Sequence, residues 1–446
     1  MKKRVMSMLL ASTTAAALLA GCGGTTSNST SSAAGSSAAA ATTKASSSSS
    51  GTKQKVTFWY NHTGDEAEVF EKAIKTYNES QDKYEVEGLS VTDDQKIVVG
   101  LSGNEAPDVI ERSNQNVLQY AQNGFIDSLN SYIDADKYDT SVFSEQSLTS
   151  NTIDGQIYGI PFESYTIQLY YNKTLLKEAG YDEPPKTMEE MYEMAVAATK
   201  LDADGNIDVL GYPLFPYASA RQELIYGFGG RWWDKDGNPT PQNEGNLASL
   251  AQNVKYREQF GGKALDSFVS TANTNRYTEQ DMFFQGKQLF RLDGSWLPTM
   301  MTKFGSDVDW GITLVPGTEA NPDLRGTSRY ETTAVVIPTK ASNKEGAWDF
   351  IKWLTGKEGA KIVDLGTGNL PALTALYDDA DFNAVPGFTE FMDALKLEKG
   401  VQYPTNMPYY SEYMNLVNSA LDTVYAGSAT PEEAMASVAE QVKSLQ

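Results

Sequence analysis

The sequence from Lys55 onwards alternates strand-like and helix-like stretches, and this alternation constrains the fold more than any other feature. Residues 55–60, KVTFWY, are rich in β-branched and aromatic side chains, as is typical of a strand. Asp65 and Glu66 then begin a helix with the charge that its N-terminus prefers. The pattern returns twice, with strands at 84–91 and 107–111 and helices from Asp93 and over 114–123. Strands that alternate with helices predict parallel βαβ units and an α/β fold.

Polar residues follow the first and third of these strands. In open α/β sheets, ligands meet the loops at the carboxyl ends of the strands. Those loops carry Asn61, His62 and Thr63 after the first strand, and Ser113, Asn114 and Gln115 after the third. The sequence therefore predicts that a ligand site, if there is one, includes this edge of the sheet.

A second α/β region begins near Tyr165. Residues 167–171 are strand-like, and the capping box Thr187–Glu190 begins a helix with an apolar stripe. Further helices are predicted at 344–354, 413–425 and 431–445. About 390 residues are too many for one ordinary core, so we expect two lobes.

The segment Asp202–Asp208, DADGNID, has acidic residues at a spacing that invites comparison with calcium loops. Its glycine comes two residues too early for an EF-hand. Asp-Gly is a strong hairpin signal, and the same dipeptide occurs at Asp154 and Asp236. We therefore predict solvated hairpins here, with calcium as the alternative at Asp202–Asp208, and no metal site elsewhere.

The N-terminus has the features of a secretory signal. Three basic residues at positions 2–4 precede a short apolar run over residues 5–20, which is too short for a membrane span. The run ends in Leu19-Ala-Gly-Cys22, which resembles the lipobox of bacterial lipoproteins. That resemblance implies removal of the signal peptide 1–21 and a lipid anchor on Cys22. The alternative is an ordinary signal in which Cys22 has no role.

The segment that follows is predicted to be a flexible tether. Residues 23–55 contain no aromatic side chain and no Val, Ile, Leu or Met, so they cannot form a core. We assign residues 22–53 to this tether. Removal of residues 1–21 changes the formal net charge from −22 to −25. Such acidity argues against nucleic acid as a partner.

The sequence lacks the usual signs of catalysis. Its one histidine, His62, excludes a zinc site with two histidines, and no P-loop, nucleophile elbow or dinucleotide fingerprint occurs. We predict no cofactor and no catalytic residue. A glycosidase with two carboxylates stays open, because its acids need to be close only in space.

Aromatic side chains near predicted loops favour carbohydrate binding instead. Trp and Tyr rings stack on the apolar faces of sugars, and amides, carboxylates and hydroxyl groups bind the sugar hydroxyls. The candidates are Trp59, Tyr165, Tyr217, Trp232, Trp233 and Trp296. For each tryptophan, packing in the core is at least as good an interpretation.

A series of motifs resembles the extracellular solute-binding proteins of ABC importers, in the maltose-type family 1. The motifs include Ala106-Pro-Asp-Val109, Asp154–Phe162 followed by Leu169-Tyr-Tyr-Asn-Lys173, Phe284-Gln-Gly-Lys287, Asp293-Gly-Ser-Trp296 and Gly368-Asn-Leu-Pro371. They occur in the family's order and extend over most of residues 55–446.

The resemblance implies a two-lobed, periplasmic-binding-protein-like (type II) α/β fold with the ligand in a cleft between the lobes. One lobe is expected at 54–164 plus 330–368, and the other at 165–329 plus 369–446. It also implies that Glu163 and Tyr165 face the cleft and that Trp296 is a sugar platform. Tyr217 and Trp232 would contribute contacts from the second lobe, and Asn61, Asn114 and Arg329 are further candidates at the cleft.

The function expected from this resemblance is capture of a carbohydrate, in particular an oligosaccharide, for import. The protein would be a monomer anchored to the cell membrane by lipid, facing outwards or into a periplasm. Its partners would be the permease subunits and their cytoplasmic ATPase. The alternatives are a protein of the same fold for a polyamine, amino acid or phosphodiester, or a secreted carbohydrate-active enzyme.

Overall fold

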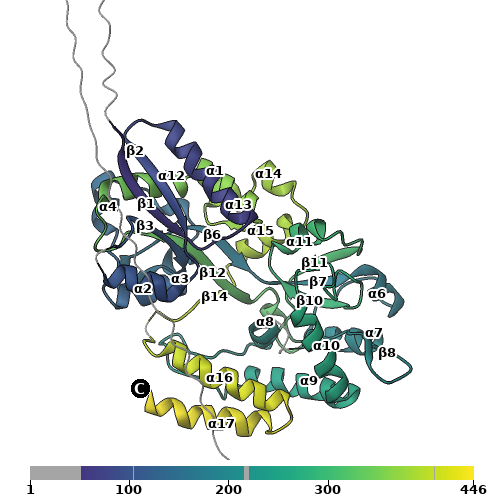
Figure 1. Ribbon diagram of the computed structural model, residues 1–446. Coiled ribbons are helices and arrows are strands. Elements are labelled where there is room, and N and C mark those ends of the chain that lie inside the picture. The colour runs from purple at the N-terminus through teal and green to yellow at the C-terminus, as the bar shows by residue number, and fades with distance from the viewer. Residues whose placement is uncertain (1–51, 104, 215–219, 406) are drawn as a thin grey trace, which may run out of the picture. The chain divides into compact units, whose positions relative to one another are not determined.

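The computed structural model describes residues 52–103, 105–214, 220–405 and 407–446 (Figure 1). These belong to one compact unit, Thr52–Gln446. The predicted signal peptide, Cys22, Tyr217 and all of the tether except Thr52 and Lys53 lie outside the described residues. No helix in the described part of the chain is both long and apolar enough to cross a membrane.

The first three strands form the parallel sheet that the sequence predicts. Strand β1 (Gln54–Tyr60) pairs in parallel with both β2 (Tyr84–Ser90) and β3 (Val109–Ser113). The connections are α1 (Asp65–Ser80) and α2 (Asp94–Ser102), and α3 (Asn114–Gln122) follows β3. The Asp93 carboxylate accepts hydrogen bonds from the first backbone N–H groups of α2, which explains why that helix begins there.

Later parts of the chain complete this sheet with antiparallel strands. Strand β12 (Ser328–Val336) lies between β3 and β6 (Ile160–Thr166), antiparallel to both, and the sheet order is β13-β6-β12-β3-β1-β2. The short strands β13 (Leu370–Pro371) and β14 (Gly400–Val401) pair with β6 and β12. The sheet is therefore mixed, and β12 brings residues from late in the chain beside α3 (Figure 1).

Helices from both ends of the sequence cover the sheet. Helix α1 packs on α13 (Lys357–Thr367), and α12 (Lys344–Leu354) contacts both of them and β1. The predicted helix at 344–354 is confirmed. The other helices before β6 are α4 (Asn130–Asp136) and α5 (Glu145–Thr149).

The second region has a small sheet that differs from the parallel arrangement expected of βαβ units. Strand β7 (Gln168–Asn172) lies between β10 (Phe290–Asp293) and β11 (Trp310–Thr313) and is antiparallel to both. Strands β10 and β11 lie more than 100 residues after β7 in the chain. The paired strands are therefore not connected by a single crossover helix, as they would be in a βαβ unit. The general α/β class is nevertheless confirmed.

The remaining helices follow β6 in the chain, and some of them pack with the large sheet and others with this second region. The Thr187 capping box is confirmed at the start of α7. The helices are α6 (Lys173–Glu178), α7 (Met188–Ala198), α8 (Ala220–Gly227), α9 (Glu244–Phe260), α10 (Gly262–Thr274), α11 (Leu297–Lys303), α14 (Ala380–Asn383), α15 (Phe388–Lys396), α16 (Tyr410–Tyr425) and α17 (Pro431–Gln441).

The predicted Asp-Gly hairpins connect short paired strands at two positions, and at Asp236 the turn is closed by a single antiparallel bridge between Trp233 and Pro239. Asp154 and Gly155 connect β4 (Thr152–Ile153) with β5 (Gln156–Ile157). The Asp202–Asp208 segment connects β8 (Lys200–Leu201) with β9 (Ile207–Val209), and the Asp202 carboxylate accepts from the backbone N–H groups of Asp204 and Asn206. That carboxylate is therefore used to shape the turn.

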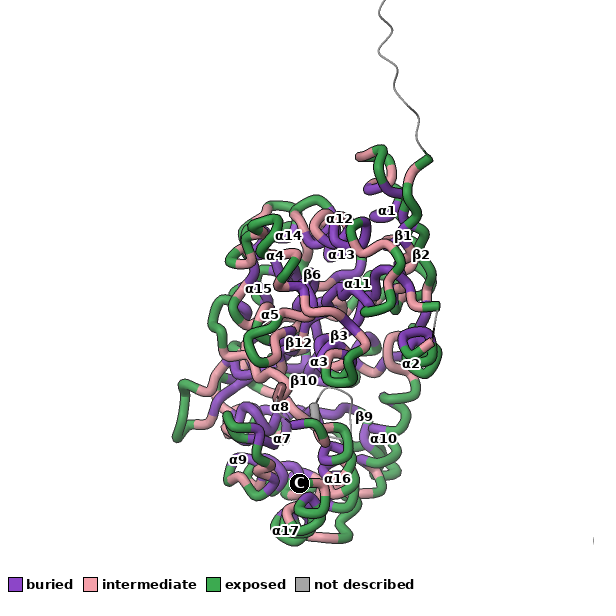
Figure 2. The backbone as a smooth tube through the Cα atoms, turned by 90° about the vertical axis from the view of Figure 1, so that its left-hand side faces the viewer, coloured by how far each residue is buried: buried purple, intermediate pink, exposed green. Residues whose placement is uncertain are grey.

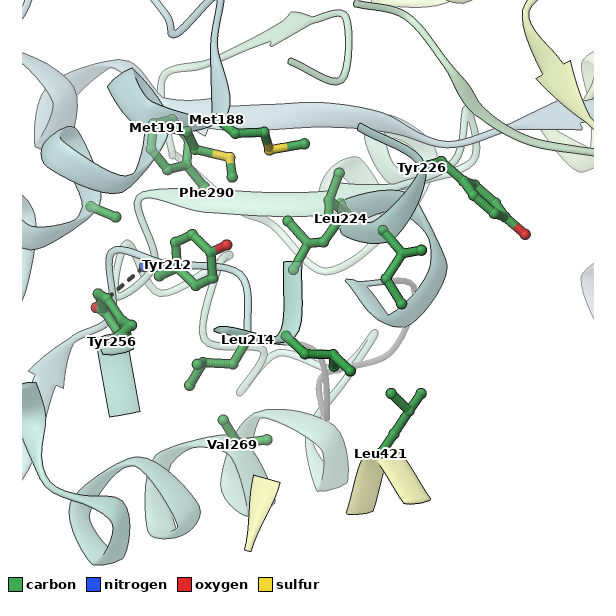
Figure 3. Close-up of a cluster of buried hydrophobic side chains, with 14 of the residues drawn as sticks. Met188, Met191, Tyr212, Leu214, Leu224, Tyr226, Tyr256, Val269, Phe290 and Leu421 are labelled. Carbon is green, nitrogen blue, oxygen red and sulfur yellow. Dashed lines mark hydrogen bonds between the residues drawn. The ribbon is translucent and has the colours of Figure 1, made fainter. Parts of the chain in front are cut away.

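Two large hydrophobic clusters form the core. One contains buried residues of α7, α9, α10, α16 and α17 together with β7 and β10, and part of it is shown in Figure 3, where the Tyr212 backbone N–H donates to the Tyr256 hydroxyl at 3.3 Å. The other joins β1–β3, β6 and α12–α13 with residues of α11 and α15. Figure 2 shows the central strands of the large sheet as buried and the outer helical faces as exposed. The lobe boundaries proposed from the sequence stay a prediction.

Candidate functional site

The loop after β1 is held by a buried carboxylate from β3. The backbone N–H of Asn61 donates to Glu111 Oε2 at 2.6 Å, while the Asn61 side chain is exposed. His62 stacks on Phe70, with ring centroids 4.7 Å apart, and its Nδ1 lies 2.9 Å from Glu66 Oε2. The loop is therefore fixed in place, with Asn61 directed to solvent.

His62 is surrounded by acidic groups. Burial alone would lower its pKa, but the hydrogen bond with Glu66 and the charges of Glu111 and Glu163 outweigh this effect and raise the pKa to about 9. Its Nε2 lies 3.9 Å from Glu111 Oε2. His62 therefore carries a positive charge at neutral pH and compensates the carboxylates beside it.

Glu163 is completely buried on β6. Its Oε1 accepts from Thr367 Oγ1 at 3.0 Å and from Asn369 Nδ2 at 2.9 Å, whereas Oε2 has no hydrogen-bond partner among the described residues. Burial raises the pKa of Glu163, and the positive charge of His62 opposes the rise. Burial and the nearby Glu163 also hold the pKa of Asp364 well above its usual range. Burial therefore favours the protonated form of both carboxyl groups relative to exposed ones.

Two partly exposed aromatic rings come together beside this buried cluster. The rings of Tyr165 and Trp296 meet edge to face, with centroids 6.4 Å apart. The Tyr165 hydroxyl is hydrogen-bonded to Thr333 on β12. Trp296 Nε1 donates to the Tyr277 hydroxyl at 2.6 Å, which in turn donates to Asp293 Oδ1 at 2.7 Å. This chain of bonds fixes the indole and leaves one part of its ring exposed.

The Asp293 carboxylate connects the rings to a buried ion-pair network. Arg291 Nε donates to Asp293 Oδ2 at 2.8 Å, and Arg291 Nη1 donates to both oxygens of Asp281, at 2.7 and 2.8 Å. All three side chains are fully buried. The two carboxylates therefore hold the guanidinium rigidly beneath Tyr277 and Trp296.

A second and looser charge cluster surrounds Arg329 at the start of β12. Its guanidinium lies 3.5 Å from Glu223 Oε1 on α8 and 3.4 Å from Glu331 Oε1, and it is partly exposed. Burial raises the pKa of Glu223 to about 7, although Arg329 opposes that rise. The Tyr403 hydroxyl donates to Glu331. We call these four residues the Arg329 cluster.

A groove lies beside the Arg329 cluster, between the α2–α3 face and the segment that begins α16. Its volume is about 390 Å³. A hydrogen bond from Gln122 Nε2 to the Thr405 carbonyl, at 3.3 Å, connects α3 with the segment before α16. We call it the α3 groove. Its lining residues are Asp94, Gln115, Asn116, Leu118, Gln119, Gln122, Tyr403, Pro404, Met407, Pro408, Tyr410, Ser411 and Glu412.

Edge-to-face contacts connect the rings at this groove. The Tyr403 and Tyr410 centroids are 5.2 Å apart, and Trp233 lies 5.4 Å from Tyr410. Both tyrosines are half-buried, so their rings are held by packing while part of each faces the groove. Such rings provide rigid apolar contact area with a polar tip.

The residues predicted for the site fall into two groups. Tyr165, Trp296, Arg329 and Asn61 keep exposed surface, as described above. Glu163, Asn114 and Trp232 are buried.

The buried members differ in what they offer. Asn114 Oδ1 accepts from the Thr332 backbone at 3.3 Å, and its Nδ2 has no partner among the described residues. Trp232 is 1% exposed, packs in the hydrophobic core and accepts a hydrogen bond from the Tyr413 hydroxyl at its carbonyl. Packing in the core is therefore the interpretation that fits Trp232, because its ring has no open face.

Sequence reasoning missed several residues that the structure brings to this region. Tyr403 and Tyr410 line the α3 groove, and Glu223 and Glu331 flank Arg329. The only local signal was the cluster of tyrosines and prolines over residues 403–410. In the part of the chain that the structure describes, no group of three His, Cys, Asp or Glu side chains could hold a metal ion.

Comparisons with known proteins agree with the fold. The family model described as bacterial extracellular solute-binding protein matches residues 72–390. A galactooligosaccharide-binding protein of Bacillus subtilis is 27% identical over 315 residues, which are 68% of this chain and 69% of that protein. A maltotriose-binding protein of Pyrococcus abyssi is 23% identical, over 77% of this chain and 72% of that protein.

Solved structures show the same architecture. The mannotriose-bound structure of CpMnBP1 matches with a TM-score of 0.74 at 23% identity, over 86% of this chain and 99% of that one. The maltose-bound MalE3 of T. maritima matches with a TM-score of 0.71 at 21% identity, over 88% of this chain and all of that one (100%). The fold-class prediction is thereby confirmed.

Proposed function

This chain belongs to the bacterial extracellular solute-binding protein family, and from that premise we propose that it captures an oligosaccharide and delivers it to an ABC importer. Relatives and structural neighbours carry names that specify maltotriose, galactooligosaccharides and mannotriose. The observation that carries the sugar assignment is the pairing of fixed, partly exposed rings with polar hydrogen-bonding side chains around them.

The proposed contacts combine stacking with hydrogen bonds. Trp296 and Tyr165 are the sugar platform, because their rings are held in place and partly exposed. Asn61 and Arg329 supply polar contacts at the periphery. Asn114 and Glu163 present unpartnered buried atoms, and a ligand would reach them only if the protein around them opened. Tyr217 stays a candidate.

Capture proceeds by closure. A ligand that touches both lobes shifts the equilibrium towards the closed state, because only that state offers both sets of contacts. The closed protein then docks on the permease subunits, whose cytoplasmic ATPase drives import. The Arg329 cluster suits such a change, since its ion pairs are long and partly exposed.

We propose that the mature protein is a monomer held to the outer face of the cell membrane by a lipid on Cys22. The support is the sequence alone, in the basic head, the short apolar run and the lipobox. Mass spectrometry of the protein from native membranes tests the anchor. Cys22 should carry an acylated glyceryl group, and a Cys22→Ala protein should be released into the medium.

The proposed activity is binding without catalysis, in keeping with a family and relatives that are binding proteins. Titration calorimetry of the soluble chain from residue 52 tests it with maltotriose, mannotriose, galactotriose and cellotriose. At least one sugar should bind, and chromatography should recover that sugar unshortened. Heat from spermidine or a peptide alone would overturn the sugar assignment, and shorter products would overturn the absence of catalysis.

A further inference from the structure

The α3 groove presents an unusual density of amide side chains. Gln115, Asn116, Gln119 and Gln122 all come from α3 and line the same groove. An amide can donate and accept at once, which is what a sugar hydroxyl requires of its neighbours. Asn116 is oriented by Ser113, whose hydroxyl donates to Asn116 Oδ1 at 2.9 Å, so that the Asn116 NH₂ group is left for a ligand.

The charged groups that line the groove are all negative. Asp94 and Glu412 lie in its wall, and no lysine or arginine is among the described residues that line it. A carboxylate, sulfate or phosphate on a ligand loses water on entry and needs a cation to compensate. The described residues of the wall provide no such cation, and the carboxylates of Asp94 and Glu412 would repel an anionic ligand.

Two guanidinium groups beside the groove, those of Arg329 and Arg112, are already engaged. Arg329 faces both Glu223 and Glu331. Arg112 is buried and donates to the backbone carbonyls of Glu111 and Val91, and its Nε lies 3.8 Å from Asp94. An anionic ligand would therefore have to displace a carboxylate or break a buried bond before it gained a cation.

We propose that the α3 groove selects uncharged oligosaccharides and rejects those that carry carboxylate, sulfate or phosphate groups. This inference rests on the proposed function and specifies its substrate class. Asp94 and Glu412 accept hydrogen bonds from ligand hydroxyls, the α3 amides bind further hydroxyls, and the rings of Tyr403 and Tyr410 contact the apolar faces.

The test compares one oligosaccharide with its own anionic form. The sugar that binds best in the calorimetric panel is oxidised at its C6 hydroxyl groups to carboxylates, and both forms are titrated at low salt. We expect the uronate to bind at least tenfold more weakly. Because Asp94 and Glu412 are exposed, about 0.5 M salt should reduce this ratio by screening.

A double variant identifies the groove as the source of the discrimination. Asp94→Asn with Glu412→Gln should reduce the ratio of the two affinities by about fivefold. The matched control, Asp204→Asn with Glu432→Gln, removes the same charge from exposed positions outside the groove and should leave the ratio unchanged. Circular dichroism verifies that both variants are folded.

The outcomes separate the two proposals. If the neutral sugar binds and its uronate binds equally well or better, the proposed selection against anionic sugars is wrong, while the proposed function stands. If the uronate is rejected equally by the wild type and the Asp94/Glu412 variant, the groove is not the selective element and this inference fails. If no sugar binds, the proposed function fails and this inference fails with it.

Discussion

The two arginine clusters of this molecule have similar components but opposite properties. Arg291 is fully buried and makes short bonds to Asp281 and Asp293, so its charge is completely matched. Arg329 is partly exposed, and its distances to Glu223 and Glu331 are 3.5 and 3.4 Å. The Arg291 network is therefore rigid and supports Trp296 through Asp293 and Tyr277. The Arg329 cluster is able to rearrange when a ligand binds.

Removal of the buried arginine should have the largest effect. Arg291→Met leaves Asp281 as an uncompensated buried charge and Asp293 with Arg276 as its remaining cation, so we expect a loss of about 3–5 kcal/mol in the free energy of unfolding. Urea denaturation followed by tryptophan fluorescence measures it. Arg329→Met is the matched comparison and should cost about 1 kcal/mol, because Glu223 can take up a proton and Glu331 is partly hydrated. Equal losses would remove the distinction between the clusters.

Glu223 should make stability depend on pH in a defined direction. Its pKa is raised from 4.5 to about 7 in the folded protein, so the folded state holds this proton more tightly than the unfolded chain. Its contribution is fully present below about pH 4.5 and is lost as pH rises through 7, for a total on the order of 3 kcal/mol. Glu223→Gln stays neutral throughout. The stability of this variant relative to wild type should therefore increase between pH 5 and pH 8, and a constant difference would contradict the assignment.

Trp296 tests whether the rigid cluster serves the ligand. Trp296→Ala removes the proposed platform and should weaken binding of the best sugar by about ten- to a hundredfold. Trp296→Phe keeps a ring but loses the hydrogen bond to Tyr277, so its affinity for the sugar should lie between those of the wild type and the alanine variant. Calorimetry gives the affinities. Unchanged affinity in the alanine variant would mean that the Trp296 ring packs against the protein and does not contact the sugar.

The smallest expected effect concerns the hydroxyl of Tyr403. Tyr403→Phe removes the hydrogen bond to Glu331 and should cost about 1 kcal/mol of stability, since Arg329 still faces that carboxylate. Thermal unfolding measures this change. A loss as large as that of Arg291→Met would show that the Arg329 cluster is as tightly built as the buried one.

The sequence predicted local elements well because their signals are local. The Thr187 capping box and the helix at 344–354 depend on residues a few positions apart, and both are confirmed. The antiparallel sheet of β7, β10 and β11 was not predicted, because its strands meet only through long-range pairing. The strand–helix alternation supplied the α/β class, and the motif series supplied the type II binding-protein fold that local patterns could not.

The same limit applies to the candidate site. Tyr165 and Trp296 were recognised from motifs, and the structure brings them together. Burial could not be judged for a single tryptophan, so Trp232 was proposed for the ligand although it packs in the core. Glu331 lies two residues from Arg329 on β12, but Glu223 comes from α8 and Tyr403 from the segment after β14, and no spacing along the chain indicates that these two join the cluster.

The register of β6 against β12 has a consequence for how specificity can change. Tyr165 is paired with Glu331, and Glu163 with Thr333, immediately before a β-bulge at Thr333/Ala334. An inserted or deleted residue in either strand would turn every following side chain to the opposite face. Diversification among related receptors should therefore proceed at these positions by exchange of side chains, whereas gains and losses of residues are tolerated only outside the paired strands.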